Sequence, residues 1–308
     1  MKISFQNSIV KAQPDPFMCQ VPGGWAMYVT GAEGVGAYFC KTPFGPWEYK
    51  GIVFRQADWV EYWAPCMHCE DNSYYLYFSC RKADTDETQE TLFVAKAPTP
   101  FGPFGEMKSL CDLFSIDPHV VRTEAGLFIW YCMDRTDGDR VGTRIFVQRM
   151  LDPVTLDGEP VEMVKPSFDE EIFMRDRFAP GQHWHTIEGP FWLQVDGWQY
   201  VMYSGACYEN EKYFIGYARA KTDETDLTKI KFEKYPDDKT YAPVLKSNEW
   251  EEGTGHHSMI KHNGEWYAIY HARNAEDDGL SGDRRNARIC RLNVEDGVIT
   301  ADRKQFEI

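Results

Sequence analysis

The sequence predicts an all-β fold built from five repeats. Five segments share one pattern, a turn followed by alternating aromatic and aliphatic residues, which is typical of β-strands. These segments are Gly24–Val29, Ser73–Phe78, Gly126–Tyr131, Gly197–Tyr203 and Gly264–Tyr270. A second predicted strand follows after a polar loop; these strands are Val35–Cys40, Thr91–Lys96, Thr143–Arg149, Tyr213–Arg219 and Ala287–Leu292.

The length of the repeat indicates the architecture. Five copies in 308 residues give a period of roughly 60 residues, which suits blades of about four strands each. The sequence therefore predicts a five-bladed β-propeller whose innermost strands line a central channel, and we expect the active site in that channel. No Ser/Gly-rich or Pro-rich linker divides the chain, which predicts a single domain over residues 1–308.

The composition narrows the setting and the partners. A net charge of −15 without a basic stripe argues against nucleic acid as a partner and favours a neutral substrate.

No apolar run approaches the roughly 20 residues that span a bilayer, and residues 1–13 lack the pattern of an export signal. Nine cysteines without framework spacing predict reduced thiols and a cytoplasmic location. The Cys66–Cys69 run has no second Cys/His pair, so zinc is not favoured.

Three short acidic motifs stand shortly before predicted strands of different repeats, so we expect their carboxylates to occupy equivalent places and to meet in the central channel. They are Gln13–Phe17 with Asp15, Ser115–His119 with Asp117, and Thr186–Phe191 with Glu188. An isolated Asp-Pro pair is most often a turn. Here the flanks are strongly apolar, so we expect each acid to begin an inner strand and to be partly buried. Buried carboxylates have shifted pKa values, and such shifts cluster at functional sites.

The set of side chains points to glycoside chemistry. Three carboxylates without a Ser–His or Cys–His pair favour glycosyl transfer to water over acyl transfer. Glu188 is the better candidate for the acid, because apolar neighbours raise the pKa of a carboxyl group. Asp15 is the better candidate for the base or nucleophile.

At this point the chain resembles glycoside hydrolase family 43, whose members are five-bladed propellers acting on arabinose- and xylose-containing glycans. The resemblance covers nearly the whole chain and rests on five motifs in the family's order. These are Asp15-Pro16, Trp63-Ala64-Pro65, Asp117-Pro118, Glu188-Gly189-Pro190 and Gly255-His256.

The resemblance implies a role for each acid. Asp15 would be the general base and Glu188 the general acid, and Asp117 would orient Glu188 and raise its pKa. The family inverts the anomeric carbon, so we expect a gap of roughly 6.5–9.5 Å between the carboxyl groups of Asp15 and Glu188.

The resemblance also implies a metal ion. In many members the residue that matches His256 contacts a calcium ion in the channel, directly or through water. One histidine among oxygen ligands and waters suits calcium better than zinc. A hydrogen-bonded structural histidine is the alternative.

Three further side chains are predicted to contact the sugar. Trp63 would form an aromatic wall and Phe17 an apolar surface near Asp15, with core packing as the alternative for both. Arg288 resembles the family's fifth-blade arginine that binds sugar hydroxyl groups, and Arg284 and Arg285 compete for that task.

We therefore expect an exo-acting enzyme that removes terminal β-D-xylosyl or α-L-arabinofuranosyl units from short oligosaccharides. The chain ends at Ile308, so no C-terminal β-sandwich of the kind found in many xylosidases of the family is expected. An endo-1,5-α-L-arabinanase and a non-catalytic glycan-binding propeller are the alternatives. Retaining fructan-cleaving enzymes fit less well, because their first motif differs from Pro14–Phe17. The oligomeric state is left open.

Overall fold

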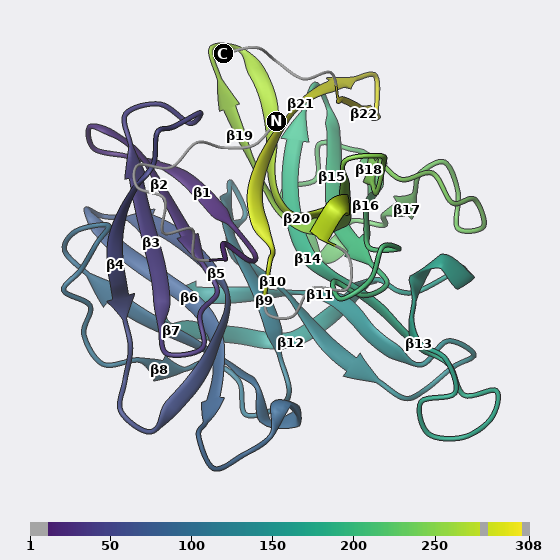
Figure 1. The fold of residues 1–308 in the computed structure, drawn as a ribbon, viewed down its shortest axis with the longest axis horizontal. Helices are drawn as coiled ribbons and strands as arrows, with labels where there is room; N and C mark the ends of the chain where they lie inside the picture. Colours follow the sequence, from purple (N-terminus) through teal and green to yellow (C-terminus); the bar gives the residue numbers. More distant parts are fainter. Residues whose placement is uncertain (1–11, 278–282, 304–308) are drawn as a thin grey trace.

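The computed structural model describes residues 12–277 and 283–303. The described chain consists mostly of antiparallel strands (Figure 1). Four single-turn 3-10 helices connect them: η1 (Glu87–Gln89), η2 (Asp169–Glu171), η3 (Leu227–Lys229) and η4 (Ala275–Asp277). None of the helices in these residues is long and apolar enough to cross a membrane.

Three of the sheets are simple antiparallel runs of four strands. The first contains β1 (Phe17–Val21), β2 (Gly24–Val29), β3 (Val35–Cys40) and β4 (Glu48–Phe54). The second contains β5 (Trp59–Glu70), β6 (Ser73–Lys82), β7 (Thr91–Ala97) and β8 (Lys108–Ser109). The last contains β19 (Glu251–His262), β20 (Glu265–Asn274), β21 (Asn286–Glu295) and β22 (Val298–Asp302).

A ten-stranded sheet contains two more runs of this kind. One run has β9 (Ile116–Thr123), β10 (Gly126–Arg135), β11 (Gly142–Asp152) and β12 (Thr155–Val164). The other has β14 (Trp184–Val195), β15 (Trp198–Gly205), β16 (Phe214–Lys221) and β17 (Glu233–Lys234), with β13 (Ile172–Met174) and β18 (Leu245–Lys246) at its sides. The two runs join where Gly142 and Thr143 of β11 pair in parallel with His185 and Thr186 of β14.

Buried clusters hold consecutive runs together. Each of the five clusters draws its side chains from two neighbouring runs, and one of them joins the last run to the first. In that cluster, Met27 of β2 and Ile269 of β20 are both fully buried. The first strands of the runs also contact one another in turn, β1 with β5, β5 with β9, β9 with β14, β14 with β19, and β19 with β1.

The predicted all-β class is confirmed, and all ten predicted strands occur as the second and third strands of the five runs. They occur because apolar and aromatic residues fill both faces of these central strands. None of the nine cysteines forms a disulfide. The count of five blades and the single domain over residues 1–308 stay predictions.

One backbone feature recurs in every run. In each run, one residue in the first strand or just before it has a positive φ. These residues are Asp15 (52°), Ala64 (46°), Asp117 (61°), Gly189 (59°) and His256 (44°). We call these five the kink residues. Proline, which has no N–H for a strand ladder, follows four of them. The ladders of β5, β9, β14 and β19 shift register at this point, as in a β-bulge.

The kinks correct one expectation about the acids. The sequence aligned Glu188 with Asp15 and Asp117, but the residue at the equivalent position is Gly189, and Glu188 precedes it. Glycine adopts a positive φ without steric cost. A Cβ on Gly189 would also come within 3.4 Å of the His256 ring.

Candidate active site

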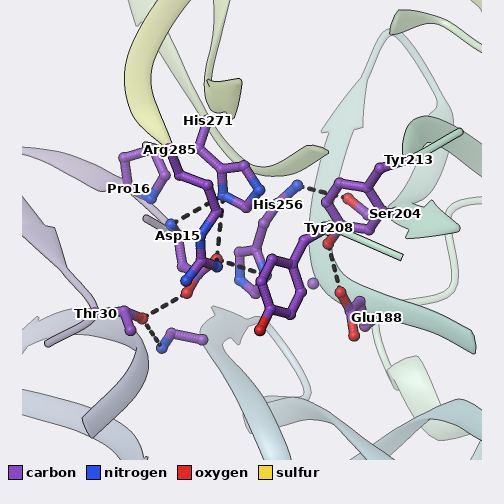
Figure 2. A network of polar contacts seen from close by, with 12 residues as sticks. Asp15, Pro16, Thr30, Glu188, Ser204, Tyr208, Tyr213, His256, His271 and Arg285 are labelled. Carbon is purple, nitrogen blue, oxygen red and sulfur yellow. Dashed lines mark hydrogen bonds and ion pairs between the residues drawn. The ribbon is translucent and has the colours of Figure 1, made fainter. Parts of the chain in front are cut away.

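The three predicted acids, two of them kink residues and the third next to one, line one cavity. This cavity has a volume of about 740 Å³, and Asp15, Asp117 and Glu188 all line it, together with Trp63 and His256. Their convergence agrees with the sequence expectation, whereas their catalytic roles stay predictions. In Figure 2, Asp15 and Glu188 lie on opposite sides of His256.

Asp15 is held in its ionised form by polar and positive neighbours. Its Oδ2 accepts a hydrogen bond of 2.5 Å from Thr30 Oγ1, and its Oδ1 lies 3.2 Å from His271 Nδ1 and 3.5 Å from Arg285 Nη1. Burial alone would raise the pKa of Asp15, but the electrostatic interactions with His256 and Arg285 and the contact with His271 outweigh it. The pKa therefore lies well below its usual range, so Asp15 is ionised, which is the state that a base must have before it accepts a proton.

Glu188 has the opposite environment. Burial raises its pKa, and the negative charge of Asp117 raises it further. The pKa of Asp117 is raised too, by burial and by the charge of Asp15, while its Oδ2 accepts a hydrogen bond of 2.8 Å from the backbone N–H of Gly189. The pKa values of Asp15 and Glu188 are thus shifted in opposite directions on one cavity, a pattern that is typical of the two carboxyl groups of an acid–base pair.

Tyr213 contacts the candidate acid directly. Its hydroxyl donates a hydrogen bond of 2.5 Å to Oε1 of Glu188, as Figure 2 shows. Its ring stacks on His271 at a centroid distance of 5.7 Å and an angle of 16°. The ring has room only because residue 255 is glycine, since a Cβ there would overlap it. The sequence did not identify Tyr213 or His271 as residues of the site, because aromatic residues in or beside strands resemble residues of the core.

Tyr213→Phe is expected to move the alkaline limb of the kcat profile upward by about one pH unit. The hydrogen bond from Tyr213 favours the ionised form of Glu188, so its loss raises the pKa of the acid. A hydrogen bond to a charged group is worth about 1.5–3 kcal/mol, and about 1.4 kcal/mol equals one pKa unit. The measurement is kcat against pH on an oligosaccharide. The control is Tyr217→Phe, which removes the hydroxyl of a buried tyrosine on β16. An alkaline limb that does not move in Tyr213→Phe would contradict the influence of Tyr213 on the pKa of Glu188.

Of the predicted sugar-binding side chains, Trp63 lies where expected. It lines the cavity with the three acids, and its Nε1 donates a hydrogen bond of 3.1 Å to Oε2 of Glu61. This bond fixes the orientation of the indole ring at the cavity wall.

Phe17 lies near Asp15 but does not line the large cavity, and its contact with the sugar stays a prediction. Phe17 lines a second, much smaller cavity of about 20 Å³. There its ring lies 6.3 Å from His119 and 6.5 Å from Phe191. Asp15 precedes β1, whose first residue is Phe17, and the Phe17 ring lies on the small cavity rather than on the wall of the large one.

Arg288 does not line the large cavity, and its predicted contact with the sugar has no support in its position. Arg288 lies inside β21, is 2% exposed, and places its Nε 3.1 Å from Oε2 of Glu251. Its competitor Arg285, which precedes the strand, lines the large cavity instead. The guanidinium of Arg285 stacks over the ring of Tyr208 at 4.2 Å.

His256 is the predicted metal ligand. Its Nδ1 lies 3.4 Å from Oδ1 of Asp15 and 4.0 Å from Oδ2 of Asp117. Within residues 12–277 and 283–303, no group of three or more His, Cys, Asp or Glu side chains is placed to hold a metal ion. Calcium needs six to eight oxygen ligands, so direct coordination by these side chains alone does not fit. No step of the mechanism below depends on a metal.

Solved structures share the fold. A thermostable family-43 glycoside hydrolase superposes with a TM-score of 0.81 at 26% identity, over 97% of this chain and 94% of the other. An α-L-arabinofuranosidase from Lactobacillus brevis superposes with a TM-score of 0.79 at 20% identity, over 97% and 96%.

Sequence relatives correct the expected location. A protein of Streptomyces avermitilis named "Extracellular exo-alpha-(1->5)-L-arabinofuranosidase" is 24% identical over 97% of this chain. This chain spans 62% of the length of that relative and of one from Streptomyces chartreusis with the same name. A third relative, from Cellvibrio japonicus, is also named extracellular. These relatives contradict the cytoplasmic location predicted from the cysteines and the first residues.

A match over nearly the whole length of the chain identifies its family. The family model described as "Glycosyl hydrolases family 43" matches residues 5–299. That range includes all three acids, Trp63 and His256, and it agrees with the five motifs of the sequence. The chain therefore belongs to glycoside hydrolase family 43.

Proposed function

We propose that this protein is an exo-acting, inverting glycoside hydrolase that removes terminal α-L-arabinofuranosyl or β-D-xylosyl units. The observation that carries the proposal is the pair of carboxyl groups on one cavity, with the pKa of Asp15 lowered and that of Glu188 raised. The names of the Streptomyces relatives support exo action on arabinofuranosides. These relatives extend beyond the matched length, so their activity is taken as support only.

In the proposed mechanism each carboxyl group moves one proton. Protonated Glu188 donates its proton to the glycosidic oxygen while the bond from that oxygen to the anomeric carbon breaks. Ionised Asp15 accepts a proton from a water molecule, whose oxygen forms the new bond on the opposite face of the sugar. The product is the inverted anomer, and the alcohol group of the leaving sugar keeps the proton from Glu188.

Asp117→Asn is expected to move the alkaline limb of the kcat profile to lower pH. The negative charge of Asp117 raises the pKa of Glu188, so the neutral amide lowers it. Glu188 must be protonated to act, hence activity is lost at a lower pH than in the wild type. The measurement is kcat against pH on one pentoside, with Glu33→Gln, an exposed carboxylate on the same cavity, as control. An alkaline limb that stays in place would rule out the tuning role.

One experiment tests the proposed function. The protein is incubated with nitrophenyl arabinofuranoside, nitrophenyl xylopyranoside and linear arabinan, and the first product anomer is followed by NMR. Release of an inverted monosaccharide supports the proposal. Internal cleavage of arabinan favours the endo-arabinanase, retention favours the fructan-cleaving type of mechanism, and no turnover by folded protein favours a glycan-binding role.

We also infer that the five runs are the blades of a propeller around this cavity. The circular order of contacts between β1, β5, β9, β14 and β19 supports this. So does the buried cluster shared by the last run and the first.

Calcium remains a proposal that rests on the family resemblance and on the position of His256 at the cavity. A hydrated calcium ion near His256 would be stabilised by the carboxylates of Asp15 and Asp117. We expect added calcium to raise Tm by a few degrees, and exhaustive chelation to lower both Tm and kcat. Retention of Tm and kcat in protein shown to be free of metal would refute it.

A further inference from the structure

A row of polar side chains leads away from Glu188 across three strands. Thr186 lies two residues before Glu188 on β14, so the two side chains share one face of the strand about 7 Å apart. Thr143 of β11 is the register partner of Thr186, and Asp134 of β10 is the register partner of Thr143. All four side chains line the 740 Å³ cavity.

This row lies on the acid's side of the cavity. The groups that contact the carboxylate of Asp15 come from the first and last runs, namely Thr30, His271 and Arg285. The row from Glu188 to Asp134 belongs to the two runs of the ten-stranded sheet. In an inverting reaction the acid stands beside the leaving oxygen and the base beside the opposite face of the sugar. The row therefore extends in the direction of the leaving group.

Asp134 is presented to the cavity in a fixed orientation. It is half-buried, and its Oδ1 accepts a hydrogen bond of 2.8 Å from Thr143 Oγ1. A second carboxylate oxygen can accept hydrogen bonds from a ligand. Thr143 and Thr186 are both about 95% buried, so they form the floor below Asp134.

Arg177 is an exposed side chain that also lines this cavity. Its guanidinium lies 4.6 Å above the ring of Trp184, which begins β14, and 5.3 Å from the ring of Phe178. A guanidinium stacked on a ring keeps its in-plane N–H groups for hydrogen bonds at the edge. Arg177 lines the same cavity as Asp134, and its charge acts on that carboxyl group.

The chemistry of this end selects a neutral sugar. An acceptor at Asp134 and donors at Arg177 match the hydroxyl groups of a sugar, which both donate and accept. An anionic unit would be repelled, because acidic side chains on the cavity outnumber the two arginines; these acids include Glu33, Glu61, Glu87, Glu209 and Asp283.

We propose that Asp134 and Arg177 bind the sugar unit on the leaving-group side of the scissile bond, and that this unit is a neutral sugar held through its hydroxyl groups. The proposal rests on the proposed function, since Glu188 as the acid defines the leaving-group side. It makes the enzyme selective for oligosaccharides over small leaving groups.

The test compares substrates that fill this end differently. The value of kcat/KM is measured on arabinobiose or xylobiose and on the nitrophenyl glycoside of the same pentose. Arg177→Ala and Asp134→Ala are expected to lower kcat/KM on the disaccharide by about 10- to 100-fold, the loss of a hydrogen bond to a charged group. The nitrophenyl glycoside, whose leaving group has no hydroxyl groups, should change by less than about threefold. Arg175→Ala, in the same loop but off the cavity, is the matched control.

A second measurement separates the two proposals. If the wild-type protein hydrolyses no pentoside, the proposed function fails, and calorimetric titration with arabinotriose and xylotriose still tests the binding site. Weaker binding by Arg177→Ala than by Arg175→Ala supports the site. Equal affinity, no binding by the wild type, or equal losses on disaccharide and nitrophenyl glycoside would overturn it. The Arg177 side chain is exposed, so its removal leaves folding intact, and thermal unfolding checks Asp134→Ala.

Discussion

Glu188→Gln is expected to lower kcat on an arabino- or xylo-oligosaccharide by about 10²- to 10⁴-fold, the usual contribution of a general acid. The amide cannot donate the proton that a sugar leaving group needs. A nitrophenolate leaves without protonation, so the loss on the nitrophenyl glycoside should be at least about tenfold smaller. The measurement is kcat for both substrates at the pH optimum of the wild type.

The control for this variant is Glu209→Gln. Glu209 lines the same cavity but is exposed, and we expect its removal to change kcat by less than about threefold. An equal loss on both substrates in Glu188→Gln would assign Glu188 a role other than proton donor to the leaving group.

Asp15→Asn is expected to lower kcat by a similar factor of about 10²- to 10⁴-fold, but equally for every leaving group. Its task is to deprotonate the attacking water, which is needed whichever group departs. The pKa of Asp15 lies well below its usual range, so the wild-type base stays ionised and limits the rate only at low pH. The measurement is again kcat on the oligosaccharide and the nitrophenyl glycoside.

Azide provides a second measurement on this variant. It attacks the anomeric carbon without a base, so it should restore part of the activity of Asp15→Asn and yield a glycosyl azide. Glu33→Gln, an exposed carboxylate on the same cavity, is the control and should resemble the wild type. A loss that depends on the leaving group, or a retained anomer in the wild type, would show that Asp15 is not the base of an inverting enzyme.

The sequence was sufficient to predict the strands and the meeting of the three acids. Both follow from local patterns, since aromatic alternation marks the strands and apolar flanks mark buried carboxylates. The same reasoning could not separate Arg285 from Arg288. The two differ by three residues, and only the start of β21 at Asn286 decides which one faces the cavity and which one pairs with Glu251 inside the run.

Contacts between distant segments were beyond the reach of the sequence for a different reason. Tyr213 contacts Glu188, and it stacks on His271, more than fifty residues away in the chain. No local pattern distinguishes a tyrosine that binds a carboxyl group from one that fills the core. Phe17 shows the converse case, because its nearness to Asp15 in the chain placed it on the small cavity that Asp15 also lines, and not on the large one.

The kink residues have a consequence for how this molecule can change. Asp15, Ala64, Asp117, Gly189 and His256 share one backbone conformation, yet their side chains range from none to an imidazole. The backbone thus provides five equivalent positions, and the chemistry depends on which side chain each position carries. Ala64 occupies the position between those of Asp15 and Asp117 in chain order. It has the same positive φ, but its methyl group carries no charge and no proton to exchange. New activities can arise here by exchange of a single side chain while the chain path stays the same.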